Sequence, residues 1–195
     1  MQFYPAGAVV PDEHRTPLLL LRPLRAADVE LDYDAVMSSA EQLRLWSQTD
    51  WPADDFTLAQ NLDDLERHER EHLERKAFTF TVLDPAGTRC LGCVYISPVK
   101  PEAASLCEGV AYAGAIGFWI RTSELACDLD RHLLATLREW IETEWAFERI
   151  VFTIGSKDSR QARLLEESGS RQSLASTLSD GRACWFYPLD LSNAS

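Results

Sequence analysis

The sequence predicts an α+β fold, and two neighbouring segments indicate it most directly. Residues 115–120 form a short apolar run that ends in a β-branched residue, which is typical of a strand buried on both faces. The next segment spaces apolar residues three and four positions apart, as on one face of an amphipathic helix: Leu129, Leu133, Leu134, Leu137, Trp140 and Ile141. The first N–H groups of such a helix lack internal partners, so the loop between strand and helix is a candidate anion site.

The segments before this unit predict one strand and two helices. Residues 1–16 are rich in proline, glycine and charge, and are expected to form an arm that is laid over the surface or partly disordered. Residues 18–24 predict the strand, and residues 26–46 predict a helix that is broken by Trp51-Pro52. Thr57 can cap the second helix. The apolar stripe of that helix is Leu58, Leu62, Leu65 and Leu73.

The remaining patterns predict five more strands and one more helix. Residues 84–87 predict the turn of a hairpin, and residues 98–109 a loop without clear period. The helix is expected at 159–168 and is ended by Gly169. The strand patterns are residues 78–83, 91–96, 148–155, a run near 174, and 183–191.

Composition predicts one domain and limits its partners. The chain has 195 residues, of which 46% are hydrophobic, enough for one core at 17–191 between the arm at 1–16 and a tail at 192–195. The net charge of −12 disfavours nucleic acid and anionic membrane surfaces as partners. The longest aliphatic run, residues 18–21, is too short to span a bilayer, and no signal-peptide pattern is present. A cytoplasmic location is therefore expected.

The cysteines are expected to be free thiols, because their number is odd and the chain is long enough to fold without disulfides. They are Cys90, Cys93, Cys107, Cys127 and Cys184. Cys90 and Cys93 have the spacing of a zinc or redox pair. They lie in a predicted strand, however, where residues three apart face opposite sides, so neither chemistry is expected.

The order of these elements resembles that of the GNAT superfamily of acyl-CoA-dependent N-acyltransferases over about residues 18–191. Residues 114–120 are similar to the family's fourth strand, residues 133–137 to the helix after its pyrophosphate loop, and residues 158–169 to its last helix. The resemblance implies a mixed, mostly antiparallel sheet of six to seven strands, flanked by about four helices. It also implies that the sheet is splayed between the strands at 115–120 and 150–154.

The resemblance implies acetyl-CoA as co-substrate and direct attack of a primary amine on the thioester in a ternary complex. The pantetheine arm would pair with backbone at 118–120 as an added strand does, and the pyrophosphate would lie on the loop before Leu133. The implied cofactor-binding residues are Phe118, Trp119, Ile120, Arg121, Asp128, Leu129, Asp130, Arg131 and Asp158.

The predicted pyrophosphate loop departs from the family pattern of Arg or Gln, two residues, Gly, one residue, and Gly or Ala. Residues 125–130 read Leu-Ala-Cys-Asp-Leu-Asp, without the glycines that let backbone N–H groups close on phosphates. Asp128 or Asp130 is expected to cap the helix, and both carboxylates are expected to repel phosphate, so acetyl-CoA binding is expected to be weak. The cations expected to help hold the phosphates are Arg121, Arg131, Lys157 and Arg160.

No catalytic base can be carried over from the family, because Ala115, Asp158 and Leu165 stand where relatives have glutamate, asparagine and tyrosine. Placement alone, with water taking the proton, is chemically reasonable. Candidate catalytic residues are Tyr95, Ser97, Glu108 and Tyr112. The acceptor is expected to be the amine of a small molecule or a peptide, and a homodimer is one possible state. A cationic acceptor is expected from the acidic residues Asp54, Asp55, Asp63 and Asp64.

Two hypotheses of other classes stay open. The first is a GNAT-fold binding or assembly module that has lost catalysis. The second is a zinc hydrolase, because His68 and His72 fit the H-E-x-x-H pattern. The residues around these histidines are mostly charged, which favours a solvated helix face with pairs such as Glu66 and Arg70, and no metal.

Overall fold

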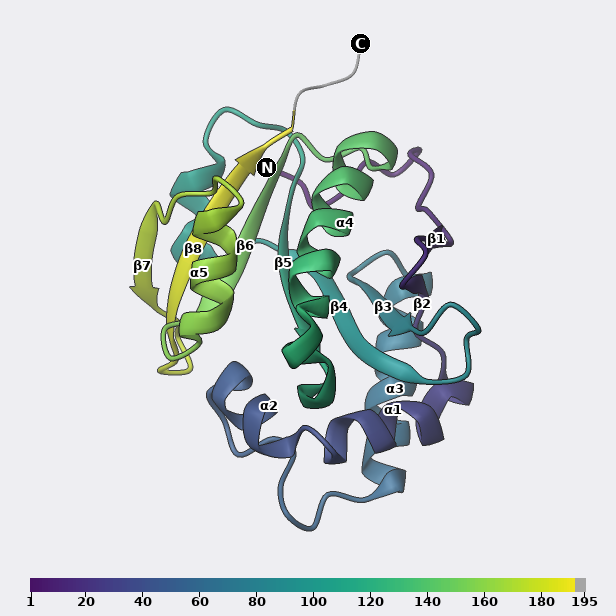
Figure 1. The fold of residues 1–195 in the computed structure, drawn as a ribbon. Coiled ribbons are helices and arrows are strands. Elements are labelled where there is room, and N and C mark those ends of the chain that lie inside the picture. The colour runs from purple at the N-terminus through teal and green to yellow at the C-terminus, as the bar shows by residue number, and fades with distance from the viewer. Residues whose placement is uncertain (192–195) are drawn as a thin grey trace.

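The computed structural model describes residues 1–191 and contains one sheet of eight strands in the order β1-β2-β3-β4-β5-β6-β8-β7 (Figure 1). The parallel neighbours are β5 and β6, and the other neighbouring strands are antiparallel. The predicted α+β class and mixed sheet are confirmed, with an eighth strand, β1, in the N-terminal segment. The strands are β1 His14–Arg15, β2 Leu20–Pro23, β3 Phe78–Leu83, β4 Cys90–Pro98, β5 Ala113–Ile120, β6 Arg149–Gly155, β7 Leu174–Thr177 and β8 Ala183–Asp190. The predicted tail at 192–195 lies outside the described residues.

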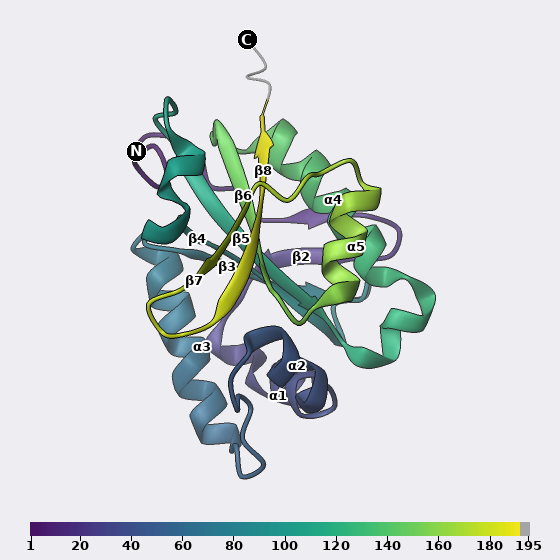
Figure 2. The same cartoon turned by 90° about the vertical axis from the view of Figure 1, so that its left-hand side faces the viewer.

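Helices cover both faces of the sheet (Figures 1 and 2). The helices α4 and α5 pack on one face, α1 and α2 on the other, and α3 lies beside α1. Their bounds are α1 Val29–Met37, α2 Ala40–Ser47, α3 Leu58–Leu73, α4 Leu129–Glu144 and α5 Ser159–Glu167. Three 3-10 helices join them: η1 Ala26–Asp28, η2 Pro101–Cys107 and η3 Thr122–Cys127. No helix within residues 1–191 combines the length and hydropathy needed to cross a bilayer.

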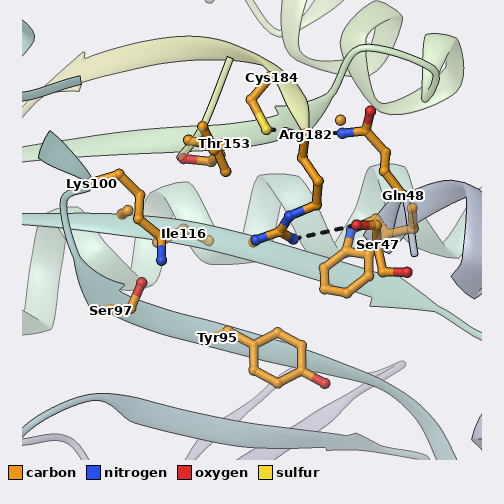
Figure 3. Close-up of a pocket in the computed structure, with 14 residues that line it drawn as sticks. Ser47, Gln48, Tyr95, Ser97, Lys100, Ile116, Thr153, Arg182 and Cys184 are labelled. Atoms are coloured by element: carbon orange, nitrogen blue, oxygen red, sulfur yellow. Dashed lines mark hydrogen bonds between the residues drawn. The ribbon is translucent and has the colours of Figure 1, made fainter. Parts of the chain in front are cut away.

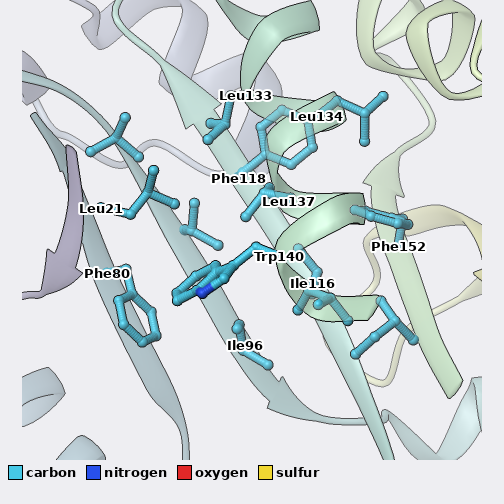
Figure 4. Packing of buried hydrophobic residues seen from close by; sticks show 14 of the residues in the cluster. Leu21, Phe80, Ile96, Ile116, Phe118, Leu133, Leu134, Leu137, Trp140 and Phe152 are labelled. Carbon is cyan, nitrogen blue, oxygen red and sulfur yellow. The ribbon is translucent and has the colours of Figure 1, made fainter. Parts of the chain in front are cut away.

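The apolar stripe of α4 forms the centre of the main core (Figure 4). Leu133, Leu137 and Trp140 are fully buried, and the Trp140 ring meets Phe80 edge to face with the ring centroids 5.0 Å apart. Each such side chain contributes about 1.5 to 3 kcal/mol by burial. This packing holds α4 on the sheet, and the buried face of the helix is the apolar stripe predicted from the sequence.

The strands β5 and β6 are paired over only part of their length. Their register runs from Ala113 opposite Arg149 to Ile116 opposite Phe152, whereas β5 continues to Ile120 and β6 to Gly155. The predicted splay between these strands is therefore confirmed. Beyond Ile116, β5 presents a backbone edge that β6 does not pair with.

The helix expected over residues 26–46 is broken into η1, α1 and α2. The break lies at Ser38 and Ser39, where the Ser38 hydroxyl donates to the Ala35 carbonyl at 3.1 Å and competes with helix continuation. The buried Ser39 hydroxyl instead accepts the Thr122 N–H at 3.1 Å. The prediction of one helix was wrong, and the break lets α2 reach the point where β5 and β6 separate. Thr57 caps α3 as predicted, and Gln60 completes a capping box with it.

The expectation that Cys90 and Cys93 face opposite sides was wrong. The pairing of β3 with β4 slips between Val82 opposite Gly92 and Leu83 opposite Cys90, which leaves an extra residue and turns both thiols toward the α1 face. Burial raises the pKa of both thiols, that of Cys90 to about 12, so they stay protonated. All five cysteines are free, as predicted.

The expectation of a solvated face at His68 and His72 was also wrong. The His68 Nδ1 atom lies 3.1 Å from the Thr79 hydroxyl, and burial lowers the pKa of His68 to about 4. The His72 ring packs edge to face on Phe78, while Leu73 of the predicted stripe is 78% exposed. No group of three or more His, Cys, Asp or Glu side chains within residues 1–191 is arranged to hold a metal ion.

The N-terminal segment is held on the core by Tyr4. The hydroxyl of this buried residue donates to the Val9 carbonyl at 2.7 Å and accepts the Ala146 N–H at 3.2 Å. The Tyr4 ring also lies edge to face against Phe78. These contacts fix the segment across the end of the α4 layer.

Asp32 gives a pH-dependent stability that can be tested. Burial between α1 and α3 raises its pKa to about 6, although Asn61 donates to it at 2.9 Å. The folded protein binds this proton more tightly than the unfolded chain, so stability falls as the pH rises from about 4 to about 6. We expect Asp32→Asn to stabilise the protein by about 1 to 3 kcal/mol at pH 8 and less at pH 5 in urea unfolding.

The exposed Asp63 on α3 provides the control for this prediction. Asp63→Asn is expected to change the unfolding free energy by less than about 0.5 kcal/mol at both pH values. Equal destabilisation by Asp32→Asn at pH 5 and pH 8 would show that the Asp32 carboxylate is stabilising when charged.

Candidate functional site

A pocket of about 160 Å³ lies where β5 and β6 separate, on the α2 face of the sheet (Figure 3). We call it the strand-gap pocket. Its walls come from β4, β5, β6, β8, the end of α2 and the loops before η2 and β8. It is lined by Trp46, Ser47, Gln48, Tyr95, Ser97, Lys100, Ala115, Ile116, Gly117, Thr153, Gly155, Leu178, Arg182 and Cys184.

A larger pocket of about 590 Å³ lies at the far end of the same strands, and we call it the loop pocket. It is bounded by residues 37–45 around the break between α1 and α2, by η3 after β5, and by residues 157–160 after β6. The strand-gap pocket therefore lies at the last residues of β5 that pair with β6, and the loop pocket lies beyond the C-terminal end of β5. This arrangement can hold a long ligand that follows a strand edge.

Two glutamine side chains bind backbone near the point where the strands separate, Gln161 on β5 and Gln48 on β8. The Gln161 Nε2 group of α5 donates to the Phe118 carbonyl of β5 at 2.6 Å, in place of a neighbouring strand. The Gln48 Nε2 group donates to the Ala183 carbonyl at 2.8 Å, and its side chain lies against Gly155, where an added Cβ would come within 2.8 Å of it. A ligand that pairs with β5 must displace the Gln161 contact.

Of the two carboxylates in the predicted pyrophosphate loop, Asp130 accepts an N–H of the first turn of α4, whereas the Asp128 side chain does not. Asp128 has left-handed backbone (φ 54°) and makes no side-chain cap; its carboxylate lies 3.0 Å from the Arg160 guanidinium. The buried Asp130 accepts the Arg131 N–H at 3.1 Å and two bonds from Arg160, at 2.5 and 2.8 Å. The short loop folds as η3, so Arg160 can reach both carboxylates and offset part of their negative charge.

The cations expected to hold phosphates are mostly engaged elsewhere. Arg121 is buried and donates to Asp34 on α1 at 2.6 Å, and Arg131 donates to Glu167 at 2.6 Å. Arg160 lines the loop pocket but is paired with Asp128 and Asp130. Lys157 also lines it and makes no ion pair within residues 1–191.

The other predicted cofactor residues are divided between the core and the loop pocket. The side chains of Phe118, Ile120 and Leu129 are buried in the α4 core, and Trp119 is buried on the α1 side. Asp158 lines the loop pocket and caps α5 by accepting the Gln161 N–H at 3.0 Å. Burial raises the pKa of Asp158.

Of the candidate catalytic residues, the structure brings two to the strand-gap pocket. Tyr95 and Ser97 line it, whereas Glu108 and Tyr112 lie before β5 and do not. The Tyr95 hydroxyl accepts from Trp119 Nε1 at 3.2 Å and points away from Ser97 and Lys100 (Figure 3). Burial raises the pKa of Tyr95 well above its usual value, so Tyr95 stays a neutral phenol.

The pocket lining includes functional groups that sequence reasoning missed. The Thr153 hydroxyl is buried and has no hydrogen-bond partner within the described part of the chain. Lys100 and Arg182 supply the charged groups of the lining, which contains no Asp, Glu or His. A buried hydroxyl without a partner is costly, so it indicates a place for a polar ligand atom. These residues lie in separate parts of the sequence, and no spacing linked them.

The acidic residues expected to favour a cationic acceptor do not line either pocket: Asp54, Asp55, Asp63 and Asp64. Asp54 is paired with Arg44 at 2.5 Å, and Asp64 with Arg67 at 3.1 Å. The electrostatic argument for a cationic amine therefore lacks support at the pocket itself.

The protein belongs to the GNAT acetyltransferase family: the family model described as "Acetyltransferase (GNAT) domain" matches residues 19–171. Among solved structures, the fold is similar to a ribosomal-protein-S5-alanine acetyltransferase from Vibrio fischeri, with a TM-score of 0.72, 15% identity, and coverage of 95% of this chain and 100% of that chain. It is also similar to Mycobacterium smegmatis RimJ in complex with CoA-disulfide, with a TM-score of 0.72, 18% identity, and coverage of 91% and 85%.

A third structure is the microcin C7 self-immunity acetyltransferase MccE in complex with acetyl-CoA and AMP, with a TM-score of 0.71 and 12% identity. The match covers 90% of this chain and 94% of that one. A search of curated protein sequences found no match. The shared family and fold define the class of protein, and the acceptor must be argued from the site.

Proposed function

We propose that the protein transfers an acetyl group from acetyl-CoA to a primary amine, by direct attack within a ternary complex. The observation that carries this proposal is the partial pairing of β5 with β6, with the strand-gap pocket over the point of separation and the loop pocket at the far ends. Acetyl-CoA has the matching shape, with phosphates at one end, an amide-containing arm and a thioester at the other end.

In this arrangement the phosphates lie in the loop pocket near Lys157 and Arg160, and the pantetheine amides pair with the β5 edge from Phe118 to Ile120. The thioester then reaches the strand-gap pocket, where the acceptor nitrogen attacks its carbonyl carbon. The C–N bond forms as the C–S bond breaks, and the proton lost by the amine nitrogen passes through water to the departing sulfur, so that CoA leaves as the thiol. Placement of the two reactants supplies the rate enhancement.

We propose that the Thr153 hydroxyl, which has no hydrogen-bond partner within residues 1–191, donates to the thioester carbonyl oxygen as negative charge develops on it. We expect Thr153→Val, which keeps the shape of the side chain, to lower kcat about tenfold and to leave the acetyl-CoA dissociation constant within about twofold. Steady-state kinetics and calorimetry measure these two effects. A change in binding alone would assign Thr153 to substrate packing instead.

The absence of Asp, Glu and His from the strand-gap lining predicts the pH dependence of the reaction. We expect kcat/KM to rise with pH and to level off near the pKa of the acceptor amine, about 8 for a peptide N-terminus. An acceptor with a more basic amine should move the inflection to higher pH. An inflection at the same pH for every acceptor would instead reveal a base on the protein.

The proposal is tested by incubating the protein with acetyl-CoA and a panel of amino acids, peptides and polyamines, and detecting acetylated product and free CoA by mass spectrometry. Direct attack predicts that no acetyl group accumulates on the protein without acceptor. Cys184 provides the control, because its thiol lines the pocket but burial raises its pKa. We expect the acetyl-transfer rate of Cys184→Ser to stay within about threefold of that of the unaltered protein. A larger loss would indicate that Cys184 carries the acetyl group in an acyl-enzyme.

The second candidate, a GNAT-fold binding module without catalysis, is favoured by one set of contacts. The Gln161 side chain donates to the Phe118 carbonyl, and the Ser39 hydroxyl accepts the Thr122 N–H. Arg160 is paired with the carboxylates of Asp128 and Asp130. The polar groups along the proposed cofactor path are thus largely hydrogen-bonded or ion-paired within the protein. This candidate predicts that acetyl-CoA shows no binding in calorimetry at millimolar concentration and that no acceptor in the panel is acetylated.

A further inference from the structure

We infer that the strand-gap pocket selects a primary amine that carries a carboxylate within the same residue-sized unit, an inference that rests on the proposed acetyl transfer. The carboxylate would be the α-carboxylate of a free amino acid or the side chain of an acidic first residue in a peptide. The charge, the chemistry and the size of the pocket lead to this class.

The charged side chains that line the pocket are both cationic, although the whole protein has a net charge of −12. Arg182 is partly neutralised, because it lies 2.7 Å from Asp180, and it also donates to the Ser47 carbonyl at 3.3 Å. Lys100 makes no ion pair within residues 1–191. Lys100 is therefore the cation available to a ligand carboxylate.

The two cations come from different walls of the pocket. Lys100 follows the end of β4 and precedes η2, while Arg182 directly precedes β8. Figure 3 shows the Lys100 ammonium group and the Arg182 guanidinium group over the same stretch of β5, with Ser97 close to the lysine. A carboxylate placed there lies beside Ile116, near the point where β5 and β6 separate.

The volume of the pocket restricts the distance between amine and carboxylate. About 160 Å³ is close to the ~150 Å³ of a cavity that holds one benzene molecule. Because the pocket must also receive the thioester, it has room for little more of the acceptor than the residue that carries the amine, with Trp46 and Tyr95 as the apolar walls for its carbon atoms. A carboxylate that meets Lys100 inside the pocket then belongs to the same residue as the amine, and the rest of a longer acceptor would lie outside the pocket.

Matched acceptor pairs that differ only in charge test this inference. The first pair is alanine and alaninamide, and the second is aspartyl-alaninamide and asparaginyl-alaninamide. Binding of each is measured by NMR titration without acetyl-CoA, and acetylation is measured separately by mass spectrometry. We expect the carboxylate member of at least one pair to bind about tenfold more tightly than its amide. Preference in the first pair identifies free amino acids, and preference in the second identifies acidic peptide N-termini.

Lys100→Gln is expected to reduce the preference for the carboxylate member at least threefold. The control is the exposed Lys76, which is paired with Glu74 at 2.6 Å and does not line the pocket. Lys76→Gln should leave the preference for the carboxylate member unchanged. Equal binding of acid and amide in both pairs, or an unchanged preference in Lys100→Gln, overturns the inference. Selective binding without acetylated product supports the inference and contradicts the proposed acetyl transfer, so the two failures are distinguishable.

Discussion

Acetyl-CoA is expected to bind the double variant Asp128→Asn and Asp130→Asn more tightly than the unaltered protein, by about 1 to 3 kcal/mol or roughly 5- to 150-fold. Both carboxylates hold Arg160, which lines the loop pocket. Neutral amides keep an oxygen that can accept from Arg160, but they leave its positive charge uncompensated for the phosphates. Asparagine also tolerates the left-handed backbone at position 128.

Calorimetry with acetyl-CoA and with CoA measures this effect. The control is Asp63→Asn with Glu66→Gln, which changes the net charge equally at two exposed positions on α3, and its affinity should stay within about twofold. An unchanged affinity in the Asp128 and Asp130 double variant would show that the phosphates do not approach Arg160. It would also place the cofactor outside the loop pocket.

Gly92→Ala is expected to destabilise the protein by about 4 kcal/mol or more, enough to remove most of the folded population of a marginal domain. Gly92 lies at the irregularity between β3 and β4, directly opposite Ile120 of β5. An added Cβ would lie 2.1 Å from the Trp119 carbonyl oxygen. Backbone cannot yield as a flexible side chain can, so β4 and β5 would have to separate.

Gly117→Ala, in the neighbouring strand, is the matched control. Its added Cβ would meet the Trp46 ring at 3.5 Å, an ordinary contact, and the expected cost is below about 1 kcal/mol. Urea unfolding of both variants measures the difference. Similar stability of the two variants would mean that the irregularity at Gly92 relaxes more easily than its close backbone contact implies.

The sequence predicted the elements whose periodicity directly reflects burial. The strand at 115–120 and the helix at 129–141 are predictable because packing against one core imposes fixed spacings on apolar residues. The break at Ser38 and Ser39 is not, because it depends on hydroxyl bonds, one of them with Thr122 on the distant η3. Periodicity contains no information about such contacts.

The irregularity between β3 and β4 shows a second limit. Strand alternation predicts opposite faces for Cys90 and Cys93, but one extra residue in β4 reverses the pattern for everything before it. His68 and His72 show a third limit, since a helix face rich in charge still packs on β3 when its few less polar side chains point there. Both errors concern contacts between successive elements, which the residue spacing within one element does not describe.

Some residues singled out from the sequence line the two pockets: Tyr95 and Ser97 the strand-gap pocket, and Lys157, Asp158 and Arg160 the loop pocket. The loop before α4 was located from the resemblance, but the pairing of Arg160 with Asp128 and Asp130 joins two helices and has no local signal. Trp46, Lys100, Thr153 and Arg182 line one pocket although they come from four separate segments. Only the three-dimensional order of the strands brings them together.

The bond from Gln161 to the Phe118 carbonyl also bears on solubility. An open strand edge in the middle of a sheet invites pairing with a strand of another molecule, which leads to aggregation. A tethered amide that occupies one carbonyl of that edge and fills the gap protects the protein whenever no ligand is bound. The Gln161 side chain therefore hinders pairing of this edge with a strand of another molecule. We expect the ligand-free protein to precipitate more readily on heating when a smaller residue replaces Gln161.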